Sequence, residues 1–134
     1  MSVEPRLTYV DSSAIVKLAV AEPESNALRR FLSRRRQLVT SALARTEVAR
    51  ALMPSGTEAV SRGEEVLRRI QVMRLNDRVL REAGRIESAE LRSLDAIHLA
   101  SARQLGSSVK HIVTYDERMA DAATASGWAV AAPR

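Results

Sequence analysis

Leu7-Thr8-Tyr9-Val10-Asp11-Ser12-Ser13 is the stretch that decides the fold. Its first four residues are mostly apolar or β-branched, a composition that favours a β-strand. The next three are Asp and Ser, which commonly cap the amino end of a helix. Apolar side chains then recur at helical spacing as far as Glu22-Pro23, where the pattern ends because the residue before proline avoids helical backbone angles. The stretch therefore predicts a strand that leads directly into a helix.

The same alternation continues along the chain. It predicts strands at residues 37–41, 72–75, 111–115 and 128–131, and helices at 24–36, 42–53, 57–70, 77–90, 94–105 and 116–126. Gly106 and Gly127 follow two of these helices, as is typical of helix ends. Alternating strands and helices favour a parallel sheet covered by helices, so we expect one α/β domain over residues 1–134 with about four or five parallel strands.

The composition narrows the chemistry. With 46% hydrophobic but only 3% aromatic residues, the core must be aliphatic. The absence of cysteine and the two isolated histidines exclude thiolate zinc sites and leave oxygen ligands for any metal. A net charge of +5 suits an anionic partner such as nucleic acid, although a GC-rich genome would also produce this excess of Arg. Without a signal peptide or long apolar stretch, we expect a cytoplasmic protein that does not enter a membrane.

Four acidic residues occupy notable positions. Asp11 and Asp116 directly follow two predicted strands, where a parallel sheet gathers its ligands, although each is also an ordinary helix cap. Glu47 shares a helix stripe with Leu43 and Ala51, and Asp95 shares one with Leu99 and Ala102, so both are expected to face inward. Buried carboxylates need a cation or hydrogen bonds to replace their lost solvation. Either Arg45 or Arg50 supplies a cation in a salt bridge, or a hard divalent ion such as Mg²⁺ or Mn²⁺ is the cation.

Four motifs follow one another in the chain. They are Val10-Asp11-Ser12-Ser13, Thr46-Glu47 followed by Val48-Ala49-Arg50-Ala51-Leu52, Leu94-Asp95-Ala96-Ile97-His98-Leu99-Ala100, and Val113-Thr114-Tyr115-Asp116-Glu117-Arg118-Met119. In this order and spacing they resemble the PIN domain family, and most closely its VapC toxins from bacterial toxin–antitoxin pairs. The resemblance spans nearly the whole chain, from Asp11 to the last predicted helix.

The resemblance implies a PIN-like sandwich in which Asp11, Glu47, Asp95 and Asp116 form an acidic pocket for one or two Mg²⁺ or Mn²⁺ ions. It implies an endoribonuclease that hydrolyses RNA phosphodiesters with metal-activated water. Thr114 matches a hydroxyl residue of the family that positions a carboxylate or a water, although it also suits a plain strand. A homodimer and inhibition by a VapB-like antitoxin are implied as well. The alternative is a non-catalytic PIN-like binding module, which the loss of an acid would mark, and none is lost.

Two further features have competing interpretations. His98 could be a general base, but its place on the helix favours a hydrogen-bonded core histidine. The basic run Arg29 to Arg36 could contact RNA, contact an antitoxin or form a solvated face, and the sequence leaves all three open.

Overall fold

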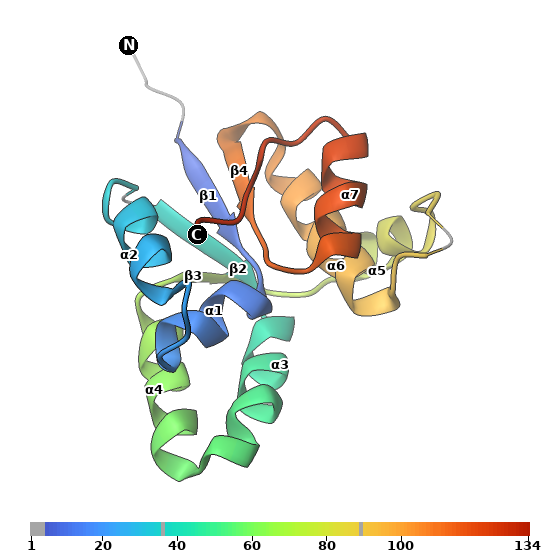
Figure 1. Cartoon of the computed structure of the whole chain (residues 1–134). Coiled ribbons are helices and arrows are strands. Elements are labelled where there is room, and N and C mark those ends of the chain that lie inside the picture. Colours follow the sequence, from blue (N-terminus) through green and yellow to red (C-terminus); the bar gives the residue numbers. More distant parts are fainter. Residues whose placement is uncertain (1–4, 36, 89) are drawn as a thin grey trace.

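The structure, a computed structural model, describes residues 5–35, 37–88 and 90–134. Its elements alternate as the sequence predicts (Figure 1). In chain order they are β1 (Leu7–Val10), α1 (Ser12–Ala19), α2 (Ser25–Ser33), β2 (Gln37–Ser41), α3 (Leu43–Leu52), η1 (Met53–Ser55), α4 (Thr57–Arg68), β3 (Gln71–Met73), α5 (Asp77–Gly84), α6 (Ser93–Leu105), η2 (Gly106–Ser108), β4 (Val109–Val113), α7 (Glu117–Ala125) and β5 (Val130–Ala131).

The strands form one five-stranded parallel sheet in the order β3-β2-β1-β4-β5. From β1 the chain moves outward to β2 and β3, then returns to β4 on the other side of β1. The strand order therefore reverses between β1 and β4. In open α/β sheets, ligands bind beyond the carboxyl ends of the strands at such a reversal. The residues that follow β1 and β4 are consequently expected to contribute to a ligand site.

Helices cover both faces of the sheet, as alternating strands and helices require. On one face Val10 and Val113 pack with α1 to α4. On the other face Tyr9 and Ile112 pack with α6 and α7, and α5 packs against α6. Figure 1 shows these two groups of helices on opposite sides of the strands. Because neighbouring residues of β1 point to opposite faces, this short strand joins both cores.

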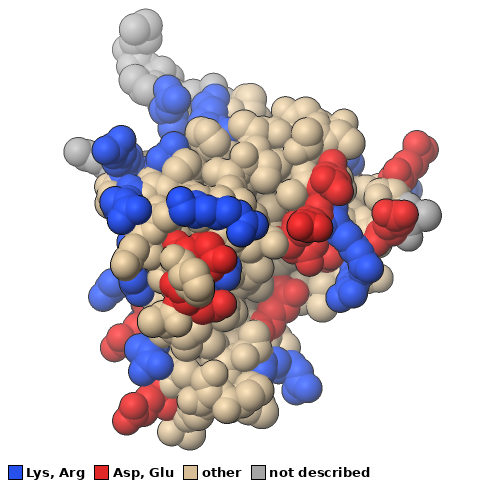
Figure 2. Space-filling model, viewed as in Figure 1, with Lys and Arg blue, Asp and Glu red and all other residues tan. Residues whose placement is uncertain are grey.

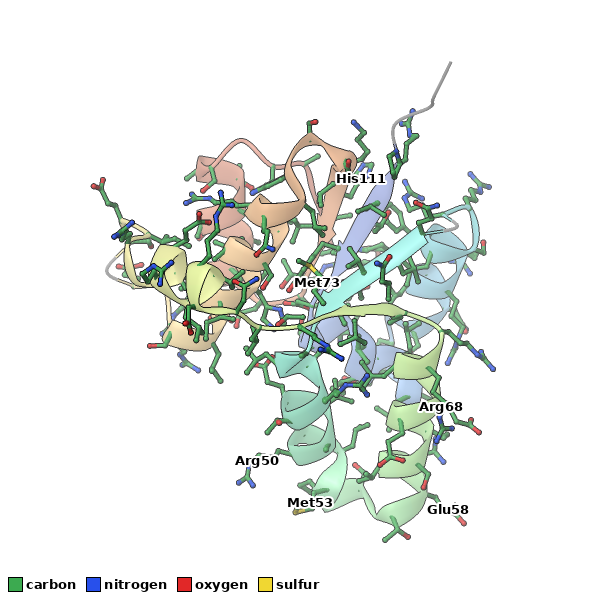
Figure 3. The ribbon with its side chains drawn as sticks, turned by 180° about the vertical axis from the view of Figure 1, so that it is seen from behind. Arg50, Met53, Glu58, Arg68, Met73 and His111 are labelled. Carbon is green, nitrogen blue, oxygen red and sulfur yellow. The ribbon has the colours of Figure 1, made fainter. Side chains whose placement is uncertain are left out.

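Helices α3 and α4 form a hairpin that projects from the carboxyl end of the sheet (Figure 1). Gly63 lies where the two helices touch, since a Cβ at this position would be 2.7 Å from Leu52 Cδ1 and 2.9 Å from Val48 Cγ1. The absence of a side chain therefore lets the helices approach closely. At the tip of the hairpin Met53 is 61% exposed and points into solvent (Figure 3).

Several predicted boundaries were wrong. The helix expected at 77–90 ends at Gly84, and the loop that follows, not a helix, brings Ile86 and Leu91 against the cores. The strand expected at 111–115 is Val109–Val113, because its first residues pair with β1 across a bulge. The other strands and helices lie within a few residues of the expected ranges, and Arg36, the predicted end of the second helix, lies outside the described residues.

None of the helices in the described ranges is both long and apolar enough to span a membrane.

Candidate active site

Asp11 is the centre of the candidate site because it joins β1 to α1 at the strand reversal. Its side chain is 3% exposed and caps α1, with Oδ1 accepting hydrogen bonds from Ala14 N at 3.1 Å and Ser13 Oγ at 2.6 Å. Oδ2 accepts a hydrogen bond from Thr114 Oγ1. Burial raises the pKa of Asp11 above its ordinary value, although the charge of His98 and these hydrogen bonds oppose the rise. The site thus begins with a buried carboxyl held in one orientation.

Thr114 connects Asp11 to Asp116. The Thr114 hydroxyl is buried just beyond β4, donates to Asp11 and accepts a hydrogen bond from Asp116 N at 3.1 Å. Asp116 in turn caps α7, with Oδ1 accepting from Met119 N at 3.0 Å. The carboxylate-positioning contact expected of Thr114 is therefore present. Both strand-end acids act as helix caps, and the Thr114 hydroxyl also joins the Asp11 carboxyl to the backbone N–H of Asp116, which capping alone does not require.

Glu47 enters the site from α3. Its Oε1 accepts a hydrogen bond from Ser12 Oγ at 2.6 Å and contacts His98 Nε2, also at 2.6 Å. Burial alone would raise the pKa of Glu47, but the hydrogen bond and charge of His98 and the hydrogen bond from Ser12 outweigh it, so the pKa lies below its ordinary value. Glu47 is consequently held as a carboxylate, with both of these contacts made to the same oxygen.

Asp95 lies half-buried in the first turn of α6. Burial, followed by the negative charges of Asp116, Asp11 and Glu47, raises its pKa to about 6, with only His98 opposing. Asp95 therefore lies close enough to Asp116, Asp11 and Glu47 for their negative charges to disfavour its own ionisation. Figure 2 shows carboxylate atoms in the hollow between α3 and the side of the molecule formed by α6 and α7. The structure therefore brings together all four acids predicted from the sequence.

Behind Glu47 lies a buried pair formed by His98 and Tyr9. His98 Nδ1 is 2.7 Å from the Tyr9 hydroxyl, and the two rings meet edge to face. Burial raises the pKa of Tyr9 well above its ordinary value, so the phenol keeps its proton. When His98 is neutral, Tyr9 donates to Nδ1 and leaves the Nε2 hydrogen to donate to Glu47. His98 is thus a hydrogen-bonded core histidine, as expected, but it also holds a site acid.

The structure corrects two expectations about Glu47. The first concerns one of the two alternatives, a salt bridge from Arg45 or Arg50: within the described ranges neither forms one, Glu47 Oε1 instead contacts His98 Nε2, and Arg50 points into solvent (Figure 3). The second was that Glu47 shares the buried stripe of its helix. That stripe is formed by Ala44, Val48 and Leu52, with Glu47 beside it. The one-residue difference places Glu47 at the edge of the core, where it reaches the other acids.

The contacts between Ser12 and Glu47 and between Tyr9 and His98 were not predicted. They join residues 35 and 89 positions apart, and no local pattern reports such pairs. The one available signal was a tyrosine in a strand that is otherwise aliphatic or β-branched, directly before Asp11. A buried tyrosine usually needs a hydrogen-bond partner for its hydroxyl.

The donor set fits a hard divalent cation. In the described part of the chain, Asp11, Asp95 and Asp116 form no ion pair with Lys or Arg, so no cationic side chain is paired directly with these three carboxyls. Carboxylate oxygens are the ligands that Mg²⁺ and Mn²⁺ prefer. Across the same residues, no three Asp, Glu or His side chains form a ready-made metal cage. A cation held here would therefore take only some of its ligands from these side chains as they stand, and the rest from water.

A doubly wound parallel sheet with acids at its strand reversal defines a class of α/β proteins with a carboxylate site. Comparison with known proteins narrows the class, because the model of the PIN domain family matches residues 8–125. Ribonuclease VapC46 of Mycobacterium tuberculosis is 54% identical over 125 residues, which cover 93% of this chain and 96% of the relative. Ribonuclease VapC35 of the same organism is 39% identical, with 95% and 97% covered. The chain belongs to the PIN domain family and, within it, to the VapC-type ribonucleases.

Solved structures agree on the fold. The crystal structure of the Mycobacterium tuberculosis toxin VapC20, described as cleaving the sarcin-ricin loop, has a TM-score of 0.77 at 18% identity and covers 94% of this chain and 99% of its own. A toxin–antitoxin complex from Klebsiella pneumoniae has a TM-score of 0.72 at 17% identity, with 95% and 98% covered. At such low identities these similarities establish the architecture alone.

Proposed function

We propose that this protein is a metal-dependent endoribonuclease whose active site is formed by Asp11, Glu47, Asp95 and Asp116, with Mg²⁺ or Mn²⁺ as the cation. The observation that carries the proposal is the buried carboxyl of Asp11, which lies among three other acids and has no Lys or Arg partner within the described residues. The 54% identity to a ribonuclease over nearly the whole chain supports RNA as the substrate.

In this proposal some side chains bind the cation and others orient those ligands. Asp11, Glu47, Asp95 and Asp116 would hold the cation, which would supply an activated water and charge stabilisation at the phosphoryl group when bound. Thr114 and Ser13 fix the Asp11 carboxyl, while Ser12 and His98 fix Glu47. Because these donors are already in place, the carboxylates need little reorganisation when RNA binds.

A cleavage assay with purified protein and RNA tests the proposal. Cleavage is expected with Mg²⁺ or Mn²⁺, is expected to stop in EDTA and to return when the metal is restored. Asp11→Asn should remove it, whereas Asp121→Asn, an exposed acid of α7 outside the pocket, should not. Cleavage that continues unchanged in EDTA would contradict the proposal. An Asp11→Asn protein that unfolds, while metal has no effect on the wild type, would favour a structural role for the acids.

We further propose that the protein is the toxin of a type II pair, with a VapB-like antitoxin as its partner and a homodimer as its own assembly. The similarity to toxin–antitoxin complexes and VapC relatives supports the toxin role and the antitoxin partner. Expression of the protein alone should stop growth, and expression together with the product of a short neighbouring gene should restore growth and yield a complex on purification. Normal growth with the active protein alone would contradict the toxin role.

The alternative, a non-catalytic PIN-like binding module, has less support because all four acids are present. The carboxyls of three of them, Asp11, Asp116 and Glu47, are each oriented by hydrogen bonds from neighbouring groups. A protein that binds RNA or a partner but cleaves no RNA with either metal would favour it.

A further inference from the structure

The end of the sheet opposite the acids is strongly basic. We call the surface formed by Arg6, Arg34, Arg35, Lys110 and His111 the basic end. Arg6 precedes β1, Arg34 and Arg35 follow α2, and Lys110 and His111 lie near the start of β4. Parallel strands bring these starting residues to the same edge. Figure 2 shows the blue side chains gathered where β1 begins, and Figure 3 shows His111 at this edge, far from the tip of the α3–α4 hairpin.

The basic end is organised around Phe31. The Arg35 guanidinium carbon lies 3.4 Å from the centroid of the Phe31 ring, and Arg35 Nη1 donates to the Phe31 carbonyl oxygen at 2.7 Å. On Phe31 the ring of His111 packs edge to face, with centroids 5.8 Å apart. A guanidinium already held over a ring and by a hydrogen bond has less side-chain freedom to lose when it binds phosphate.

The positive charges of the basic end are not neutralised within the described residues. Arg6, Arg34, Arg35 and Lys110 form no ion pair with a carboxylate there, and Lys110 Nζ donates instead to the Ser107 carbonyl oxygen at 2.7 Å. These side chains also lie close enough to affect one another. Partial burial of His111 lowers its pKa most, and the positive charges of Arg35 and Arg6 lower it further. Clustered like charges favour a polyanion as partner, since each phosphate bound relieves repulsion and releases counterions.

We propose that the basic end is a second RNA contact that holds backbone phosphates of an RNA whose cleaved bond lies in the acidic pocket. The proposal rests on the ribonuclease function above. RNA is favoured over an acidic protein because the surface is dominated by Arg, whose planar guanidinium matches phosphate, and because one guanidinium is already stacked on an aromatic ring. β1 is buried along its length, so an RNA that reaches both ends must pass over the helices that cover the sheet, a path longer than the roughly 13 Å of β1 itself.

Fluorescence anisotropy in EDTA tests the proposal without cleavage, with a labelled single-stranded RNA long enough to span both ends. Arg6→Gln combined with Arg35→Gln should weaken binding roughly tenfold and reduce the slope of log K against log salt by about 1.4, for two lost phosphate contacts. The matched control, Arg78→Gln combined with Arg81→Gln, removes the same charge from exposed positions on α5 and should stay within about twofold of the wild type.

A second pair, Arg34→Gln with Lys110→Gln, leaves the Phe31 stack intact and should weaken binding in the same direction, which separates charge from folding. Wild-type affinity and salt slope in both pairs would overturn the proposal. So would unchanged RNA binding with lost antitoxin binding, which would make the basic end a protein interface. Failure of the proposed function gives a different result, because the wild type would then cleave no RNA with Mg²⁺ or Mn²⁺. The binding comparison would still show whether the basic end contacts RNA.

Discussion

The two ends of the central sheet differ in charge and in how that charge is held. At the carboxyl end, the Asp11 carboxyl is 3% exposed and fixed by donors on both oxygens. At the amino end the cations are more exposed, and Arg35 is ordered mainly by its contacts with Phe31. Both ends concentrate like charge, which costs stability in the free protein. Carboxyls held in fixed orientations around one buried acid suit chemistry at one bond, whereas exposed cations suit contact with any RNA backbone.

Removal of one acid should have the largest effect. Asp95→Asn keeps the shape of the side chain but removes a charge from the pocket, so RNA cleavage at saturating Mg²⁺ should fall about a thousandfold. Binding of RNA in EDTA should stay as strong or become stronger, because a repulsive charge is gone. Cleavage within about threefold of the wild type would show that the acids at the carboxyl end of the sheet do not carry out the chemistry.

Loss of the His98 contact should have the next largest effect. In His98→Phe the ring remains but Glu47 loses its donor, and cleavage should fall about ten- to a hundredfold. His98→Gln, which restores a donor, should recover part of the loss and lower the Mg²⁺ concentration needed for half-maximal rate. Equal losses in both variants, with the same metal requirement, would show that His98 acts only through packing.

The pH dependence of cleavage should distinguish the acidic pocket from the basic end. The pKa of Asp95 is raised to about 6, so the fraction of ionised carboxylate falls below that pH. The rate at limiting Mg²⁺ should therefore rise with pH and level off above about 6, with a change of about tenfold per unit at lower pH. RNA binding through the Arg side chains should not follow this curve. Equal rates at about pH 5 and about pH 7 would contradict the assignment.

The smallest effect concerns stability. The folded-state pKa of Asp95 lies above its value in the unfolded chain, so the folded state binds more protons between about pH 4 and about pH 6 and loses stability as pH rises through that range. Asp95→Asn removes the cost. Without metal it should be more stable than the wild type at about pH 8, by roughly 1 kcal/mol after allowance for solvent screening, and no more stable below about pH 4.

Denaturant unfolding at the two pH values measures this difference. An Asp95→Asn protein that is less stable at both would mean that Asp95 supports the fold, and the repulsion inferred among the four acids would be wrong.

The sequence predicts the order of strands and helices better than the side-chain contacts between distant elements. The strand–helix alternation, the parallel sheet and the strand-end positions of Asp11 and Asp116 follow from short patterns, because local propensity and caps act within a few residues. The buried stripe of α3 was misplaced by one residue, since Ala is a weak guide to which face of a helix is buried. The contact of His98 with Glu47 depends on helices 51 positions apart in the chain. Tertiary packing alone decides such a contact.

Calorimetric titration of the protein with Mn²⁺ tests most directly whether the four carboxyls at the strand reversal hold a divalent cation for RNA cleavage. The wild type should bind Mn²⁺, Asp95→Asn should lose most of that affinity together with cleavage, and Asp121→Asn and the double variant Arg6→Gln with Arg35→Gln should bind as the wild type does. Equal Mn²⁺ binding by Asp95→Asn and the wild type, or RNA cleavage by a wild type that binds no metal, would contradict the account.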